Sequence, residues 1–320
     1  MRAPLGQRGL TLVELLVAAL MGSIVLGAVV QLLVVSSRHY ARTETLAQMQ
    51  EQADVAIRFL RDDARMAGHW GALRDAAVIK GGARADDPNP AGLALPARCA
   101  PRFTTDLLRA VEVRTTTDAW GCRVTARTDS HALALRYASA EAFAPQANRL
   151  QLVGDTEAAR LTLRAQTPDA SIPGAGIRDL AVRGYYVAPS STVFPDQPVL
   201  RRMTLNALTS GPRYIDEEIT PGVEVFRIAA HIDLDGDSVA DTIVPAGHPA
   251  LGRLDAMGAA THQPIALTLA VVVRSETARW RGVGAHTFEA SDETLHFPDD
   301  GYLRVMSIAT VRMRNARVRL

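Results

Sequence analysis

The sequence predicts an α+β protein in which one long N-terminal helix packs on an antiparallel β-sheet. Two observations lead to this fold class. An apolar run near the N-terminus continues into an amphipathic stretch, with no proline or glycine from Gln31 through Ala67. Beyond residue 105, segments of alternating apolar and polar residues follow one another, separated by turns rich in proline, glycine and aspartate.

The apolar run extends from Gly9 to Ser36 and follows a leader that contains Arg2 and Arg8 but no acid. A helix needs about 20 apolar residues to span a bilayer core. The run is too long for the core of a secretory signal peptide, and no small-residue cleavage site follows it. The basic leader favours an orientation with the N-terminus inside. We therefore expect a membrane-spanning helix.

One carboxylate, Glu14, lies near the start of this run. A charge at the bilayer centre costs about 3 kcal/mol and is rare without a partner. Glu14 either reaches the lipid headgroups or pairs with a cation in apolar surroundings.

The helix is expected to continue beyond Ser36, because apolar residues recur there at three- and four-residue steps. This apolar stripe consists of Leu46, Met49, Ala53, Ile57, Leu60, Ala64 and Ala67. Gly68 is the predicted stop, which gives about 58 residues or about 87 Å of helix. A free-standing coiled coil would show a similar stripe, but the strand-rich sequence downstream needs a layer on which to pack.

The rest of the chain is expected to form a long irregular connection and then strands. Glycine and proline are frequent from His69 to about Thr105, which is typical of loops. The period of two then predicts about nine strands. These are Leu108–Arg114, Ala132–Tyr137, Arg149–Val153, Arg160–Arg164, Leu180–Val187, Leu200–Asn206, Val223–Ile232, Ile265–Val273 and Leu303–Met313.

Composition and motifs argue against an enzyme or a nucleic-acid protein. The formal net charge is +1, whereas nucleic-acid binding normally requires a strong basic excess. The eight histidines show no paired ligand spacing. The sequence contains no nucleophile elbow, phosphate-cradling loop or zinc-binding helix motif.

Two cysteines, Cys99 and Cys122, follow the predicted membrane span. With the N-terminus inside, both lie in an extracytoplasmic space, where disulfides persist. A bridge would close a loop of about 24 residues and contribute roughly 3 kcal/mol. The alternative is a pair of unpaired buried thiols.

Four aspartates, Asp233, Asp235, Asp237 and Asp241, occupy positions 1, 3, 5 and 9 of one segment. This pattern suits calcium, which prefers oxygen ligands. The EF-hand template fails, because Gly236 stands at position 4 and Val244 at position 12. A weak calcium site and a simple acidic β-turn both remain open. Calcium is the one cofactor that we consider.

The N-terminal segment Arg8-Gly9-Leu10-Thr11-Leu12-Val13-Glu14-Leu15 resembles the class III signal of type IV pilins and type II secretion pseudopilins. The resemblance implies that prepilin peptidase cleaves between Gly9 and Leu10 and that Leu10 is then N-methylated. Most family members have phenylalanine at the position of Leu10. The resemblance also implies that Glu14 pairs with the terminal amine of a neighbouring subunit, an attraction that offsets the desolvation of both charges.

Later segments resemble PilW-like minor pilins. They are Gln50-Glu51-Gln52, Arg61 to Gly68, Tyr185-Tyr186-Val187, Leu200-Arg201-Arg202, Pro221-Gly222-Val223-Glu224, Asp233 to Asp237, Val271 to Ser275 and Met313-Arg314-Asn315. The implied organisation is a leader (1–9), a transmembrane half-helix (10–36), an amphipathic periplasmic half-helix (37–68) and a periplasmic β-rich domain (69–320).

The family resemblance implies a structural subunit that helps to initiate pilus assembly and supports twitching motility and adhesion. Its expected partners are prepilin peptidase, other minor pilins, the major pilin and the inner membrane, with no nucleic acid. The chain would cross the inner membrane once, with the N-terminus cytoplasmic and the C-terminal domain periplasmic, before it enters the pilus. A J-type minor pseudopilin of type II secretion is the first alternative. A membrane-anchored periplasmic calcium-dependent binding module or hydrolase is the second.

Overall fold

The computed structural model describes residues 11–84, 86–164, 176–235, 237–252, 264–280, 282, 284–290 and 293–315. Gly9, Leu10 and Gly236, which carry sequence predictions, lie outside the described residues. The chain divides into two compact units, Met1–Gln48 and Met49–Leu320. Helix α1 (Leu12–Met66) begins in the first unit and ends in the second.

The first unit presents its apolar side chains on the surface. The large apolar side chains between Leu12 and Val35 are 44% to 75% exposed. This part of α1 is long and apolar enough to cross a membrane. Since apolar surface is unstable in water, these side chains require lipid or an apolar protein partner.

In the second unit, the end of α1 buries the apolar stripe that the sequence predicts, except for Leu46, which is half-buried and belongs to the first unit. Its buried residues are Met49, Ala53, Ala56, Ile57, Leu60 and Ala64, and Ala67 follows them into the core. Gly68, with φ +74°, ends the helix as predicted. A positive φ at this position is typical of the glycine that terminates a helix. The Gly68 N–H donates to the carbonyl of Arg136, 3.1 Å away, and so ties the helix end to a strand.

The first sheet has eight strands around the long strand β6 (Gly176–Ala188). Along one edge β6 pairs with β3 (Ala132–Ala138), and along the other with β4 (Gln151–Gly154) and β7 (Val199–Leu208). The remaining strands are β1 (Ile79–Lys80), β2 (Val111–Arg114), β5 (Ala159–Thr162) and β8 (Gly211–Pro221). The β1–β5 pair is parallel, and the other pairs are antiparallel.

The second sheet has the order β10-β9-β11-β14 and is antiparallel. Its strands are β9 (Val223–Ile232), β10 (Thr242–Pro245), β11 (Pro264–Arg274) and β14 (Arg304–Arg312). A separate hairpin, β12 (His286–Ala290) with β13 (Glu293–Phe297), packs on it through a small apolar cluster.

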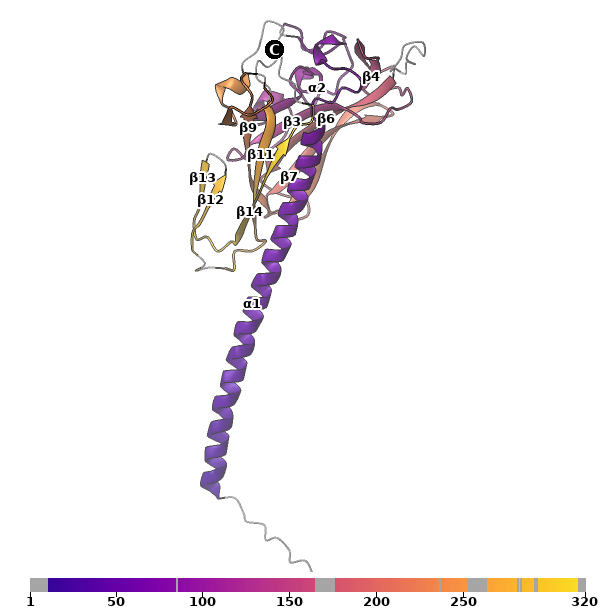
Figure 1. Cartoon of the computed structure of the whole chain (residues 1–320). Helices are drawn as coiled ribbons and strands as arrows, with labels where there is room; N and C mark the ends of the chain where they lie inside the picture. Colours follow the sequence, from indigo (N-terminus) through magenta and orange to yellow (C-terminus); the bar gives the residue numbers. More distant parts are fainter. Residues whose placement is uncertain are drawn as a thin grey trace, which may run out of the picture. The chain divides into compact units, whose positions relative to one another are not determined.

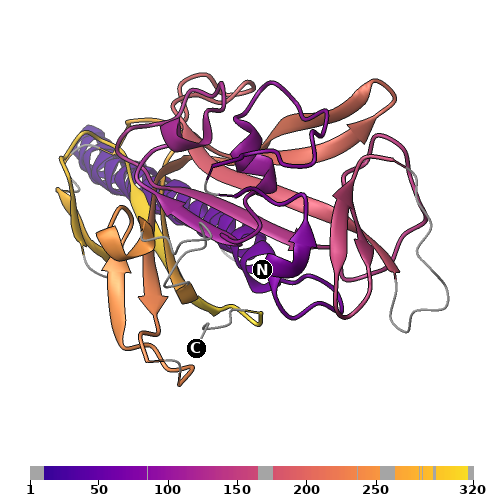
Figure 2. The same ribbon diagram turned by 90° about the horizontal axis from the view of Figure 1, so that it is seen from above.

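The first sheet lies between the end of α1 and the irregular segments of residues 69–131, which connect α1 to β3 (Figures 1 and 2). Alternate side chains of β3 and β6, such as Ala134 and Val182, join a core cluster with Trp70, Phe103 and Trp120 from that connection. The intervening side chains face α1: the hydroxyl groups of Tyr137 and Tyr185 bond to a carboxylate on the helix. The connection is therefore a packed layer. It contains the short helices η1 (Ala76–Val78), α2 (Pro101–Thr105) and η2 (Asp118–Trp120), and η3 (Pro249–Gly252) lies later in the chain.

Gly222 joins the two sheets at a point where a side chain would not fit. Its φ is +84°, and an added Cβ would lie 3.1 Å from the Gln52 side chain on α1. Its backbone N–H donates to the carbonyl of Pro198, and its carbonyl accepts from the Arg274 N–H. The turn between β8 and β9 is thereby held against both sheets and the helix.

The predicted α+β fold is confirmed, and each of the nine predicted strands is present, β9 with the predicted bounds and the others with ends shifted by a few residues. The prediction of about nine strands was nevertheless too low, because β1, β8, β10, β12 and β13 were missed. In β8, the run Asp216-Glu217-Glu218 breaks the alternation. These acids fit a strand because Arg201 and Arg202 on β7 pair with them across the ladder.

Candidate functional site

The N-terminus of α1 is closed by a capping box formed by Thr11 and Glu14. The Thr11 hydroxyl accepts a hydrogen bond from the Glu14 N–H at 3.2 Å. In return, one carboxylate oxygen of Glu14 accepts from the N–H and the hydroxyl of Thr11, both at 3.0 Å. This reciprocal pattern satisfies helix N–H groups that otherwise have no intrahelical partner.

The capping box lowers the free-energy cost of placing the Glu14 carboxylate in an apolar run. A carboxylate in an apolar run is costly when its oxygens have no donors, but here Thr11 supplies two donors from within the same chain. A Thr-x-x-Glu motif before an apolar run is a recognised start signal of helices, so the sequence carried this information. Because Leu10 lies outside the described residues, its pairing with Glu14 stays a prediction.

A second carboxylate, Asp63, fixes the end of α1 on the first sheet. Its side chain accepts hydrogen bonds from the hydroxyl of Tyr137 on β3, at 2.6 Å, and from the hydroxyl of Tyr185 on β6. The guanidinium nitrogens of Arg183 and Arg202 each lie 3.7 Å from the same carboxylate. One helical side chain therefore contacts three adjacent strands.

Burial keeps the two tyrosines protonated as donors. It raises the pKa of Tyr137 above its ordinary value, and the negative charge of Asp63 raises it further. The pKa of Tyr185 is raised for the same two reasons. Arg202 also stacks over the ring of Phe59 on α1, 5.1 Å from its centroid. The result is a polar anchor that sets the register of the helix on the sheet.

Sequence reasoning did not identify Asp63. It stands in a charged run beside Asp62, which is exposed and lies 3.8 Å from Arg61. Nothing in the local pattern separates two neighbouring aspartates, because the tyrosines that distinguish them are far away in sequence.

Cys99 and Cys122 form a disulfide. Backbone hydrogen bonds join the same two segments on both sides of the disulfide. The Ala100 N–H donates to the carbonyl of Trp120, and the Arg123 N–H donates to the carbonyl of Arg98. The bridge therefore holds the connection after α1 in place, and the alternative of two unpaired thiols is wrong.

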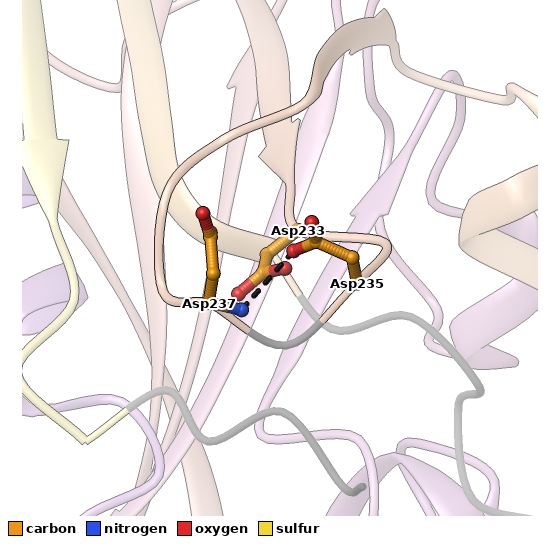
Figure 3. A group of neighbouring side chains, drawn as sticks. All are labelled: Asp233, Asp235 and Asp237. Atoms are coloured by element: carbon orange, nitrogen blue, oxygen red, sulfur yellow. Dashed lines mark hydrogen bonds between the residues drawn. The ribbon is translucent and has the colours of Figure 1, made fainter.

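The loop between β9 and β10 brings three predicted ligands together. Figure 3 shows Asp233, Asp235 and Asp237 gathered on this loop. One oxygen of each lies within 4.8 Å of the others. Asp233 is buried, whereas Asp235 and Asp237 are exposed. Such a group of oxygens has the chemistry of a calcium site.

These carboxylates also organise the loop itself. Asp235 accepts from the Asp237 N–H at 3.1 Å, Asp237 from the Val239 N–H at 2.7 Å, and Asp233 from the Ser238 N–H at 2.7 Å. Asp241, the fourth predicted ligand, is not in this group of three. Its carboxylate caps the start of the loop by accepting from the Leu234 N–H at 2.6 Å.

Comparisons with known proteins bear on both ends of the chain. Residues 5–30 match the prokaryotic N-terminal methylation motif. Residues 184–315 match the family of type IV pilus-assembly protein W. No curated protein sequence matches the chain. A type IV-like pilin from Thermus thermophilus is similar in structure, with 14% identity, a TM-score of 0.31 and coverage of 65% of this chain and 84% of that chain.

The first match covers the start of α1, where the capping box lies, and the second covers the end of β6 and strands β7 to β14. The chain therefore carries an N-terminal methylation motif and a PilW region, and these two matches support a minor pilin of the type IV pilus.

Proposed function

We propose that this minor pilin helps to initiate pilus assembly through its N-terminal helix and supports twitching motility and adhesion. The observation that carries the proposal is Glu14, a carboxylate at the start of an exposed apolar helix, inside the matched methylation motif. Nothing else in the apolar part of the first unit, from residue 12 to 35, carries a formal charge.

The proposed mechanism is an exchange of hydrogen-bond donors. Prepilin peptidase removes the leader between Gly9 and Leu10, which creates a terminal amine on N-methylated Leu10. In the separate subunit, Thr11 supplies the donors to Glu14. On assembly, the amine of a neighbouring subunit approaches the carboxylate, and the two charges attract strongly where little water screens them.

The second unit has a structural role in this proposal. It supplies contacts to other minor pilins and to the major pilin, and it has no catalytic activity. The chain inserts in the inner membrane with its N-terminus cytoplasmic and its sheets periplasmic, and later enters the pilus. The match to type IV pilus-assembly protein W favours this machine over the type II secretion alternative.

Two variants at Glu14 separate charge from capping. Glu14→Gln keeps a side-chain oxygen that can accept from Thr11, whereas Glu14→Ala removes both the acceptor and the charge. We expect both variants to insert in the membrane and both to reduce incorporation into sheared pili. Normal piliation with Glu14→Gln would refute the charge pairing.

Intact-mass spectrometry of the membrane-extracted chain tests the processing step directly. The proposal requires a mature chain that begins with N-methyl-Leu10. An uncleaved N-terminus would instead support an anchored periplasmic binding module.

A further inference from the structure

A basic groove of about 680 Å³ lies in the second unit, away from the capped N-terminus of α1. Its walls are the end of β14 and the residues after it, Thr310–Arg314, together with Ile265, Ser238 and Arg65. Arg65, Arg312 and Arg314 are all exposed.

No carboxylate of the described residues pairs with any of these three arginines. Arg312 donates to the backbone carbonyl of Ser238 at 3.1 Å, and that carbonyl carries no formal charge. In contrast, Arg136, Arg201 and Arg304 each pair with a carboxylate within 3.0 Å. The groove therefore holds three arginines that form no ion pair within the described part of the chain, while the exposed carboxylates of Asp235 and Asp237 lie on the loop that supplies Ser238.

The same groove borders a strand with an available edge. Within the described ranges, β14 pairs with β11 and with no other strand. The Met313 N–H donates to the carbonyl of Ile265, so odd-numbered residues direct their backbone groups toward β11. In an antiparallel ladder, the even-numbered residues of β14 then direct their backbone N–H and C=O groups away from β11. Thr310 and Arg312 thus present backbone donors and acceptors on the free side of β14.

We infer that this groove binds an extended, acidic segment of a partner protein, which adds as a strand to the edge of β14. Arg312 is the last residue of β14, and Arg314 lies in the turn directly after it. Both arginines are therefore placed to pair with carboxylates of a strand that is added at this end of β14. Main-chain hydrogen bonds supply affinity in such strand addition, and charge pairs supply selectivity. A polyanion without a peptide backbone would use the arginines alone.

The inference goes beyond the proposed function, because it assigns a second contact surface that does not depend on Glu14. A chain with Glu14→Gln that fails to enter pili is expected to bind the acidic segment normally. Failure of the two proposals is therefore distinguishable.

The test uses the full chain in detergent micelles and a labelled synthetic peptide of alternating glutamate and threonine. Fluorescence anisotropy measures its affinity, with a glutamine–threonine peptide and inorganic polyphosphate as comparison probes. Arg65→Ala, Arg312→Ala and Arg314→Ala are each expected to weaken binding about two- to fivefold, as for exposed ion pairs. The matched control is Arg58→Ala, which removes an exposed arginine on the same helix outside the groove.

The strand edge is tested at Thr310. Thr310→Pro removes an N–H that faces away from β11, a position at which an edge strand tolerates proline. Thr310→Ala controls for the loss of the hydroxyl, which contacts Thr268 at 3.0 Å. We expect weaker peptide binding with proline than with alanine. The arginine series keeps the proposal testable if the proline variant does not fold.

Three results would overturn the inference. The arginine variants could bind the glutamate peptide as tightly as the unaltered chain, or Arg58→Ala could weaken binding as much as Arg65→Ala. Folded Thr310→Pro could also match Thr310→Ala while polyphosphate competes fully, which would indicate binding of charge without strand addition.

Discussion

The carboxylate of Asp63 on α1 lies 2.6 Å from the hydroxyl of Tyr137 on β3. The surrounding contacts of the helix are apolar and therefore non-directional. A hydrogen bond between a charged acceptor and a buried hydroxyl is directional and stronger than one between neutral groups. Asp63 thus fixes the rotation of α1 about its own axis and its position along the sheet, while the apolar stripe supplies most of the buried area.

Replacing Asp63 should destabilise the second unit. Asp63→Ala leaves the hydroxyl group of Tyr137 without its acceptor and leaves that of Tyr185 with only the Phe59 carbonyl, 3.4 Å away. Each unsatisfied buried polar group costs about 1–3 kcal/mol. We expect the free energy of unfolding to fall by about 2–4 kcal/mol in denaturant titrations followed by circular dichroism. Asp62→Ala is the matched control, and it should change stability by less than about 0.5 kcal/mol. Equal losses of unfolding free energy in both variants would contradict the role of Asp63 in fixing α1 on the first sheet.

The fold was predictable from the sequence where one local period dominates. The stripe from Met49 to Ala67 repeats at helical spacing, and β9, which is buried along most of its length, has the bounds that were predicted. Strand β8 was missed because its acids are stabilised by arginines on a neighbouring strand, a contact that local pattern does not record. Asp63 was missed for the same reason, because its partners lie on distant strands.

The candidate site was predictable to a similar extent. Gly9, Leu10 and Glu14 were predicted because one short motif contains them all, and the roles of all three remain predictions. The aspartates of the β9–β10 loop were identified from their spacing, but the backbone donors that they accept from depend on how the loop folds. Spacing could not show that Asp241 bonds to Leu234 and is not part of the group of three.

His131 should make stability depend on pH. Burial lowers its pKa from 6.5 to about 4, and the positive charge of Arg227 contributes. Between these values the unfolded chain binds a proton that the folded chain does not, so stability rises with pH through this window. Acidification from pH 6.5 to 4 should therefore cost roughly 2–3 kcal/mol through this group. His131→Gln should flatten the profile of unfolding free energy against pH. The same change at exposed His248 is the control, and an unchanged slope in His131→Gln would exclude His131 as the source.

The disulfide should stabilise the connection after α1. Removing it in Cys99→Ser/Cys122→Ser should lower the free energy of unfolding by roughly 3 kcal/mol, because the unfolded chain regains the entropy of the closed loop. Dithiothreitol should destabilise the unaltered chain to a similar degree and leave the double variant unaffected. A double variant that still responds to the reductant would show that its effect lies elsewhere.

The calcium hypothesis for the β9–β10 loop is tested by substitutions that keep the loop hydrogen bonds. Asp235→Asn and Asp237→Asn each retain a side-chain oxygen that can accept from the backbone, so they remove charge alone. If the loop binds calcium, a tenfold excess over the dissociation constant should stabilise the unaltered chain by about 1.4 kcal/mol. The double variant should lose this response in thermal melts. Identical calcium shifts in both proteins would reject the site.

The capping box is expected to affect how much of the chain is present in the membrane before assembly. Thr11→Val removes the hydroxyl that donates to Glu14 and accepts from its N–H, while Thr11→Ser retains both bonds. Loss of a helix N-cap costs about 1 kcal/mol, and in lipid the carboxylate also loses a donor that water cannot replace. We expect Thr11→Val to lower the amount of chain in the membrane and Thr11→Ser to leave it unchanged, measured by immunoblot of membrane fractions.

The same pair of variants also separates two roles of Glu14. If the terminal amine of a neighbour replaces Thr11 as the donor on assembly, the Thr11→Val chains that do insert should enter pili in the usual proportion. The ratio of pilus to membrane protein should then stay constant in Thr11→Val and fall in Glu14→Gln. A ratio that falls equally in both variants would mean that Thr11 is still required after assembly, and the exchange of donors at Glu14 would be wrong.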